Sequence, residues 1–129
     1  MFLAQNILIV EDEYLIALDL AQTVVEQGGH VVGSCATVGD ALVMLDRHGI
    51  DGAILDGTLP DGEVTPVALR LADRGIPMIV YSGTGLPTGL AGRLPNLPVV
   101  FKPASSATVL AGLAREMGLA QPGRVDPLK

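Results

Sequence analysis

Short runs of β-branched and aliphatic residues alternate along the chain with longer segments in which apolar residues recur at helical spacing. The apolar runs lie at residues 6–10, 30–35, 51–55, 77–81 and 97–101. Helical patterns follow most of these runs, at residues 13–26, 38–47, 65–73 and 105–117. Strands that are apolar on both faces and are followed by helices are typical of a parallel sheet covered on both sides.

Capping residues and helix breakers mark the ends of these segments. Thr37 is the expected N-cap of the second helix, and Ser105 or Ser106 that of the last helix. Residues 56–62 are rich in turn formers and predict a loop. The segment from residue 82 to residue 97 contains four glycines and two prolines, so any helix there must be short and frayed.

Repeated βα units predict one architecture for most of the chain. We expect a flavodoxin-like (βα)5 fold, in which a doubly wound parallel five-stranded sheet has the order 2-1-3-4-5 and helices on both faces. The domain should occupy residues 1–119. Residues 120–129 include two prolines and a glycine and should form a flexible tail.

Composition and charge narrow the classes of function. The 129 residues are 49% hydrophobic and 17% charged, which favours one folded domain over a disordered chain. The net charge of −6 and the lack of a basic cluster argue against direct nucleic-acid binding. The single cysteine, Cys35, excludes a disulfide framework, and no long apolar run or basic leader is present, so we expect a cytoplasmic protein that does not insert into membranes.

Polar and charged residues follow four of the five expected strands. Glu11 and Asp12 follow the first strand, Asp56 the third, Ser82 the fourth and Lys102 the fifth. Because ligands of doubly wound sheets bind outside the carboxyl ends of the strands, these side chains should converge on one pocket. Carboxylates placed together repel unless a cation neutralises them, and oxygen ligands of this kind suit Mg²⁺.

The same pocket contains the groups needed to accept a phosphoryl group. Asp56 is the candidate nucleophile, because an attacking carboxylate forms an aspartyl phosphate. Lys102 can place a positive charge on the phosphoryl oxygens, and Ser82 can donate a hydrogen bond to one of them. A cis peptide bond before Pro103 would fix the approach of the lysine.

The order Glu-Asp, Asp, Ser, Lys-Pro on five βα units resembles the receiver domain of two-component response regulators, and the resemblance spans residues 7–117. It implies that Asp56 is phosphorylated from the phosphohistidine of a histidine kinase or a histidine phosphotransfer protein. It also implies that Asp12, Asp56 and the backbone carbonyl of Thr58 bind Mg²⁺, with Glu11 assisting directly or through water. Ser82 and Lys102 would sense the phosphoryl group.

Two segments resemble a subgroup of single-domain receivers with an atypical fourth helix, which is common in alphaproteobacteria. They are residues 15–20 and residues 81–85. One position departs from the usual receiver pattern, because Val99 stands three residues before the lysine, where many receivers carry a switch tyrosine or phenylalanine. We therefore expect the glycine- and proline-rich segment 83–96 to carry the signal by reordering when Ser82 engages the phosphoryl group.

The first helix offers a candidate partner surface. Apolar residues occur nearly all round it, more than one buried stripe requires, so some must be exposed. In the resembling family the start of this helix docks on the kinase or phosphotransfer protein. We assign to this surface Glu13, Leu15, Ile16, Asp19 and Pro103.

About a dozen residues follow Met117, so we expect no fused output domain. Output should run through a downstream protein target, or the domain should act as a phosphate sink. On this interpretation the protein is not an enzyme but a stoichiometric acceptor that catalyses only its own phosphorylation and dephosphorylation. The sequence is compatible with a homodimer.

Two other functions start from the same residues. Asp56-Gly57-Thr58-Leu59 resembles the end of the Asp-x-Asp-Gly-Thr-Leu motif of haloacid dehalogenase-type phosphatases, which are Mg²⁺-dependent and form an aspartyl phosphate, but Ile54 stands where that motif has its nucleophile. A nucleotide- or flavin-binding module is the other alternative. The glycine-rich segment 83–89 favours it, although the lysine of a phosphate-binding loop is missing.

Overall fold

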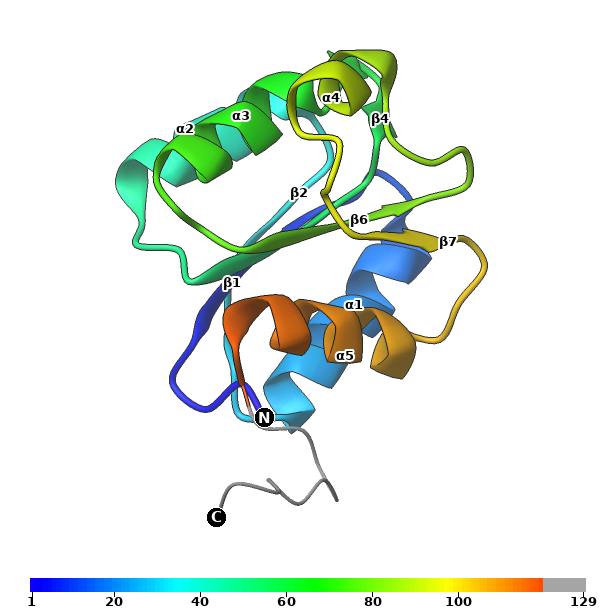
Figure 1. Cartoon of the computed structure of the whole chain (residues 1–129). Coiled ribbons are helices and arrows are strands. Elements are labelled where there is room, and N and C mark those ends of the chain that lie inside the picture. The colour runs from blue at the N-terminus through cyan, green and yellow to red at the C-terminus, as the bar shows by residue number, and fades with distance from the viewer. Residues whose placement is uncertain (120–129) are drawn as a thin grey trace.

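The computed structural model describes residues 1–119, which form a five-stranded parallel sheet between two layers of helices (Figure 1). The strands, in chain order, are β1 (Asn6–Val10), β2 (His30–Cys35), β3 (Gly52–Leu55), β6 (Met78–Ser82) and β7 (Val99–Phe101). Their spatial order is β2-β1-β3-β6-β7, and every neighbouring pair is parallel. This is the predicted 2-1-3-4-5 order, and the flavodoxin-like fold is confirmed.

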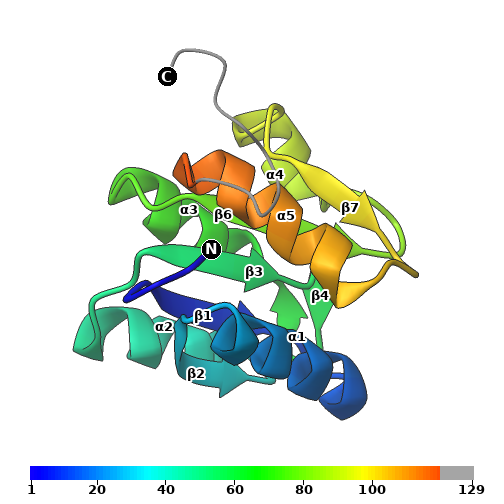
Figure 2. The same ribbon diagram turned by 90° about the horizontal axis from the view of Figure 1, so that it is seen from below.

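The helices divide between the two faces of the sheet. Helices α1 (Tyr14–Glu26) and α5 (Ser106–Met117) cover one face, and α2 (Val38–Arg47), α3 (Thr65–Asp73) and α4 (Thr88–Arg93) cover the other (Figures 1 and 2). Alternate strand residues enter the two cores. In β1, Leu8 and Val10 pack towards α2 and α3, while Ile7 and Ile9 pack towards α1 and α5. The core is largely aliphatic, as a chain with 3% aromatic residues requires.

The predicted helix caps are present. The Thr37 hydroxyl accepts a hydrogen bond from the Asp40 amide (3.1 Å) at the start of α2. At the start of α5 the Ser105 hydroxyl accepts one from the Thr108 amide (3.1 Å), so Ser105 and not Ser106 is the cap. The helix expected at residues 105–117 therefore begins one residue later, at Ser106.

The segment between β3 and α3 was expected to be a loop but contains a small hairpin. Strands β4 (Thr58–Leu59) and β5 (Gly62–Glu63) pair antiparallel. The turn of the hairpin is joined to helix α2. The Asp61 carboxylate accepts hydrogen bonds from the amides of Val38 (2.8 Å) and Gly39 (3.1 Å) at the start of that helix. The positive φ of Gly62, 137°, completes the turn.

The fourth helix is short, as expected from its glycines and prolines. It covers only Thr88–Arg93 and is anchored by the fully buried Leu90. The last strand starts at Val99, two residues later than predicted, since Pro98 has no amide hydrogen to donate to a neighbouring strand. No helix in the described part of the chain is long and apolar enough to cross a membrane. The tail predicted at residues 120–129 lies outside the described residues.

Candidate functional site

The candidate site lies at the carboxyl edge of the sheet, where hydrogen bonds extend the strand pairing by one residue. The Glu11 amide donates to the Cys35 carbonyl (2.8 Å), and the Asp56 amide donates to the Val10 carbonyl (2.7 Å). On the other side the Lys102 amide donates to the carbonyl of Ser82 (3.0 Å). Backbone hydrogen bonds to neighbouring strands therefore fix the positions of Glu11, Asp56 and Lys102.

Three carboxylates gather at this edge, as predicted. Glu11, Asp12 and Asp56 each present an oxygen, and these oxygens lie within 4.8 Å of one another. Glu11 is 4% and Asp56 9% exposed, whereas Asp12 is exposed. The donor set consists of oxygens and includes an exposed carboxylate open to water, which fits Mg²⁺, a cation that binds one or two carboxylates and retains several waters.

Lys102 bridges the two buried acids. Its Nζ lies 2.8 Å from Glu11 Oε1 and 3.4 Å from Asp56 Oδ2. Backbone amides satisfy the remaining oxygens, because the Glu13 amide donates to Glu11 Oε2 (3.2 Å) and the Thr58 amide donates weakly to Asp56 Oδ1 (3.5 Å). The lysine therefore holds the cluster together, and either acid could lose this partner when a cation or a phosphoryl group arrives.

Burial and crowding change the acidity of the cluster. Burial, together with the neighbouring Asp56 carboxyl, raises the pKa of Glu11 to about 7 even though the Lys102 hydrogen bond acts in the opposite direction. For Lys102, burial lowers the pKa, but the contacts with Glu11 and Asp56 outweigh it and the net shift is upward. Lys102 is therefore protonated at neutral pH, whereas Glu11 takes up or releases a proton near neutrality.

Ser82 lies at the end of β6 with its hydroxyl turned into the glycine-rich segment. Ser82 is 3% exposed. Its Oγ accepts a hydrogen bond from the Thr84 amide (3.2 Å) and lies 3.4 Å from the Thr84 hydroxyl. A Cβ on Gly57 would come within 3.2 Å of the Ser82 Oγ, so the residue after Asp56 must be small for the two loops to meet. Ser82 thus borders the acidic cluster without a hydrogen bond to it.

The connection after Lys102 is fastened by a residue that the sequence did not single out. The peptide bond between Lys102 and Pro103 is cis. Beyond it, the Tyr81 hydroxyl donates to the Ala104 carbonyl (2.9 Å) and accepts from the Ala104 amide (3.0 Å). Lys102 Nζ lies 5.4 Å from the centroid of the Tyr81 ring. A tyrosine at the end of a buried strand was the available signal, because a buried hydroxyl needs a partner.

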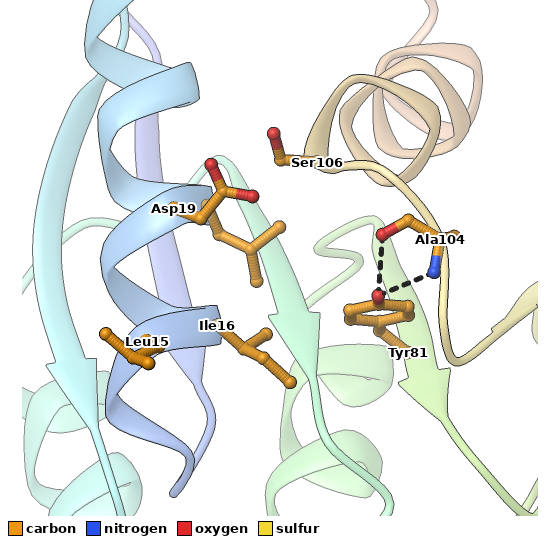
Figure 3. Close-up of a pocket in the computed structure, with 7 residues that line it drawn as sticks. Leu15, Ile16, Asp19, Tyr81, Ala104 and Ser106 are labelled. Atoms are coloured by element: carbon orange, nitrogen blue, oxygen red, sulfur yellow. Dashed lines mark hydrogen bonds between the residues drawn. The ribbon is translucent and has the colours of Figure 1, made fainter.

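Part of the candidate partner surface lines a groove of about 170 Å³ between α1 and the start of α5 (Figure 3). Its lining comprises Leu15, Ile16, Asp19, Leu20, Tyr81, Ala104 and Ser106. Leu15 is 77% exposed, in agreement with the expectation that the first helix carries exposed apolar residues. Glu13 and Pro103 are exposed but do not line the groove.

Comparisons with known proteins agree with the fold. No family model matches the chain. The transcriptional regulatory protein PdtaR of Mycobacterium tuberculosis is 33% identical over 76 residues, which are 59% of this chain and 37% of PdtaR. The response regulator PhyR of Brucella abortus is 30% identical, with a TM-score of 0.77 over 91% of this chain and 49% of PhyR. The chain thus spans about half or less of the length of these two relatives.

A third relative matches over its whole length. The BeF3-activated conformation of SdrG from Pseudomonas melonis is 40% identical and has a TM-score of 0.68 over 93% of this chain and 100% of SdrG. The chain belongs to the receiver domains of response regulators, the proteins of two-component signalling.

Proposed function

We propose that this receiver domain is a phospho-acceptor switch in which Asp56 takes a phosphoryl group from the phosphohistidine of a histidine kinase or a phosphotransfer protein. The observation that carries the proposal is the cluster at the sheet edge. There Lys102 Nζ contacts both Glu11 and Asp56, and Asp12 adds an exposed carboxylate within 4.8 Å. The BeF3-activated conformation of its relative SdrG supports the same class of chemistry.

The proposed transfer uses side chains that already lie at the carboxyl edge of the sheet. An Asp56 carboxylate oxygen attacks the phosphorus, an O–P bond forms, and the N–P bond of the donor breaks with its electron pair remaining on the histidine nitrogen. Lys102 already lies 3.4 Å from Asp56 and neutralises charge on the phosphoryl oxygens. Ser82 exchanges its contact with Thr84 for a hydrogen bond to one of these oxygens.

Mg²⁺, when bound, would neutralise the acids and the incoming phosphoryl oxygens. Asp12 and Asp56 would hold it, with Glu11 close enough to assist directly or through water. The carbonyl of Thr58 is the fourth proposed ligand, and Thr58 already lies beside the cluster through its amide contact with Asp56. On this proposal the domain is a stoichiometric acceptor and not an enzyme, because it catalyses only its own phosphorylation and dephosphorylation.

Donor docking is assigned to the groove between α1 and α5. Leu15 and Ile16 supply apolar contact and Asp19 supplies charge on one wall, while Glu13 and Pro103 are exposed at neighbouring positions. The groove is lined by Ala104, two residues beyond Lys102, so a protein bound there is held next to the acceptor. Output through a downstream protein, or use as a phosphate sink, completes the proposal.

The two alternatives find less support in the structure. Ile54, at the position of a phosphatase nucleophile, is 1% exposed and packs in the core beneath α1 and α5. Only the last two residues of the glycine-rich segment 83–89 belong to the short helix α4, and the segment contains no lysine for a nucleotide phosphate. Neither position offers the reactive group that the alternative function needs.

Phosphorylation by a small donor tests the proposed function. Wild-type protein incubated with acetyl phosphate and Mg²⁺ should gain one phosphoryl group by intact mass, and chelation of Mg²⁺ should prevent the gain. Asp56→Asn should gain none. Asp73→Asn, which changes an exposed acid at the end of α3, is the matched control and should behave as wild type. Labelling of Asp56→Asn at the wild-type rate would refute the assignment of the acceptor.

A further inference from the structure

Tyr81 contributes to two parts of the molecule at once. Its side chain leaves β6 directly before Ser82 and is 5% exposed. Its hydroxyl contacts both backbone polar groups of Ala104 and its ring lies beneath the Lys102 ammonium. Figure 3 shows the hydroxyl between the amide and the carbonyl of Ala104. One side chain therefore connects the strand that carries Ser82 with the loop that carries Lys102.

The Tyr81 hydroxyl makes hydrogen bonds to the backbone of Ala104 of the kind that a neighbouring strand would make. Strand β7 ends at Phe101, and the last sheet-like hydrogen bond beyond it joins the Lys102 amide to the Ser82 carbonyl (3.0 Å). Pro103 has no amide hydrogen, so it cannot continue the pairing. The Tyr81 hydroxyl supplies the next two hydrogen bonds, at Ala104, directly before Ser105, the N-cap of α5. The backbone is thus held by hydrogen bonds at Lys102 itself and two residues later, at Ala104.

The ring acts on the lysine side chain itself. Lysine is a flexible point charge that can direct its ammonium group to many places. Here the ammonium contacts Glu11 at 2.8 Å and Asp56 at 3.4 Å on one side and lies 5.4 Å from the Tyr81 ring centroid on another. An aromatic face within this range attracts a cation. The ring is therefore a further attractive contact for the ammonium, in addition to Glu11 and Asp56.

We propose that Tyr81 is a positioning residue for phosphoryl transfer, which acts by holding the Lys102 backbone and ammonium against Asp56. The inference rests on the proposed function, because it concerns the same transfer to Asp56. It assigns to Tyr81 a role beyond filling the core. In a purely structural role Tyr81 would affect stability, and any effect of its substitution on labelling would be the same with and without Lys102.

The test uses Tyr81→Phe, which keeps the ring and removes only the hydroxyl. Tyr14→Phe, which changes the 74% exposed tyrosine of α1, is the matched control. With acetyl phosphate and Mg²⁺, Tyr81→Phe should lower the maximal labelling rate about tenfold, the size expected when one catalytic group loses its position. Its Mg²⁺ affinity, followed by amide chemical shifts, should stay within about twofold of wild type because the carboxylates are untouched.

A double-mutant cycle separates positioning from a structural effect. If Tyr81 acts through Lys102, adding Tyr81→Phe to Lys102→Ala should change the labelling rate by less than about twofold, because the group that it positions is already missing. An equal loss of rate in the presence and absence of Lys102 would overturn the inference, as would a wild-type rate for folded Tyr81→Phe. If wild-type protein takes up no phosphoryl group, the proposed function fails and the inference fails with it.

A measurement on the wild-type protein keeps the test decisive if Tyr81→Phe does not fold. With Mg²⁺ and beryllofluoride, a mimic of the phosphoryl group, the Ala104 amide should remain at least as protected from hydrogen exchange as in the free protein. The Tyr81 hydroxyl must hold the loop while Lys102 engages the mimic. Faster exchange at Ala104 upon binding would contradict the inference, even when binding itself supports the phospho-acceptor function.

Discussion

The Glu11 carboxyl holds a proton more readily than an ordinary glutamate because it is buried beside Asp56, and this brings its pKa to about 7. A carboxyl whose pKa is raised by folding stabilises the protein fully below its ordinary pKa, and this stabilisation is lost as the pH rises through the folded value. The stabilisation is therefore lost from about pH 4.5, the ordinary pKa, until the pH passes the folded pKa of about 7. Lys102 reduces the cost of ionising Glu11 without removing it.

The stability of the metal-free protein should consequently decrease between pH 6 and pH 8. For a folded pKa of about 7, the linkage relation gives a loss of about 1 kcal/mol in the free energy of unfolding over this interval. Urea denaturation in the presence of a chelator measures it. Glu11→Gln cannot ionise and should show a flatter profile. A loss of the same size in Glu11→Gln would mean that another group is responsible.

At the scale of elements, the exposed start of α1 can be separated from the acceptor chemistry. Leu15→Asp should slow phosphotransfer from a protein donor by about tenfold or more, since a charge placed in an apolar contact loses its hydration. Labelling by acetyl phosphate should stay unchanged. Leu15 is a cleaner probe than Ile16, because Ile16 also packs against the core.

The matched control for Leu15→Asp is Val43→Asp, on α2 at the opposite face of the sheet, where the side chain is 47% exposed. It adds the same charge to another exposed apolar position and should leave both donors unaffected. Equal slowing by the two variants would indicate a general effect of negative charge. Slower labelling of Leu15→Asp by the small donor would show that the variant disturbs the acceptor site instead.

The glycine-rich segment 83–96 is the second element whose behaviour can be predicted. Ser82 Oγ accepts a hydrogen bond from the Thr84 amide, and this contact should be exchanged when the hydroxyl turns to a phosphoryl oxygen. We therefore expect amide exchange across residues 83–96 to change upon adding Mg²⁺ and beryllofluoride. Ser82→Ala should lose most of this change while still binding Mg²⁺. Unchanged protection in wild type would rule out this segment as the carrier of the signal.

The sequence predicted the elements and the acidic cluster because both follow from local pattern and general topology. Apolar runs define the strands, and the carboxyl ends of parallel strands must meet at one edge, which brought Glu11, Asp56 and Lys102 together. The contacts that were missed join positions far apart in the chain. Asp61 caps a helix that starts 23 residues earlier, and the Tyr81 hydroxyl reaches Ala104, 23 residues later. No local pattern encodes such distances.

At the scale of the whole molecule, the site exists only when the sheet is complete. Its residues come from the ends of β1, β3, β6 and β7, which are separated in sequence by the crossover helices. The unfolded chain holds no comparable cluster of carboxylates, so a cation bound at this site favours the folded state by mass action. Mg²⁺ binding at the carboxyl edge of the sheet is therefore linked to the stability of the whole domain.

This linkage predicts how Mg²⁺ stabilises the protein. Once the Mg²⁺ concentration exceeds the dissociation constant, each tenfold increase should add about 1.4 kcal/mol to the free energy of unfolding at pH 8, where Glu11 is ionised. Asp12→Ala removes an exposed ligand and should shift the onset to higher Mg²⁺ concentration, whereas Asp73→Ala, at an exposed acid outside the site, should not. A dependence on Mg²⁺ that is the same in all three proteins would arise from general screening of the net charge of −6. The cluster at the sheet edge would then not be the Mg²⁺ site.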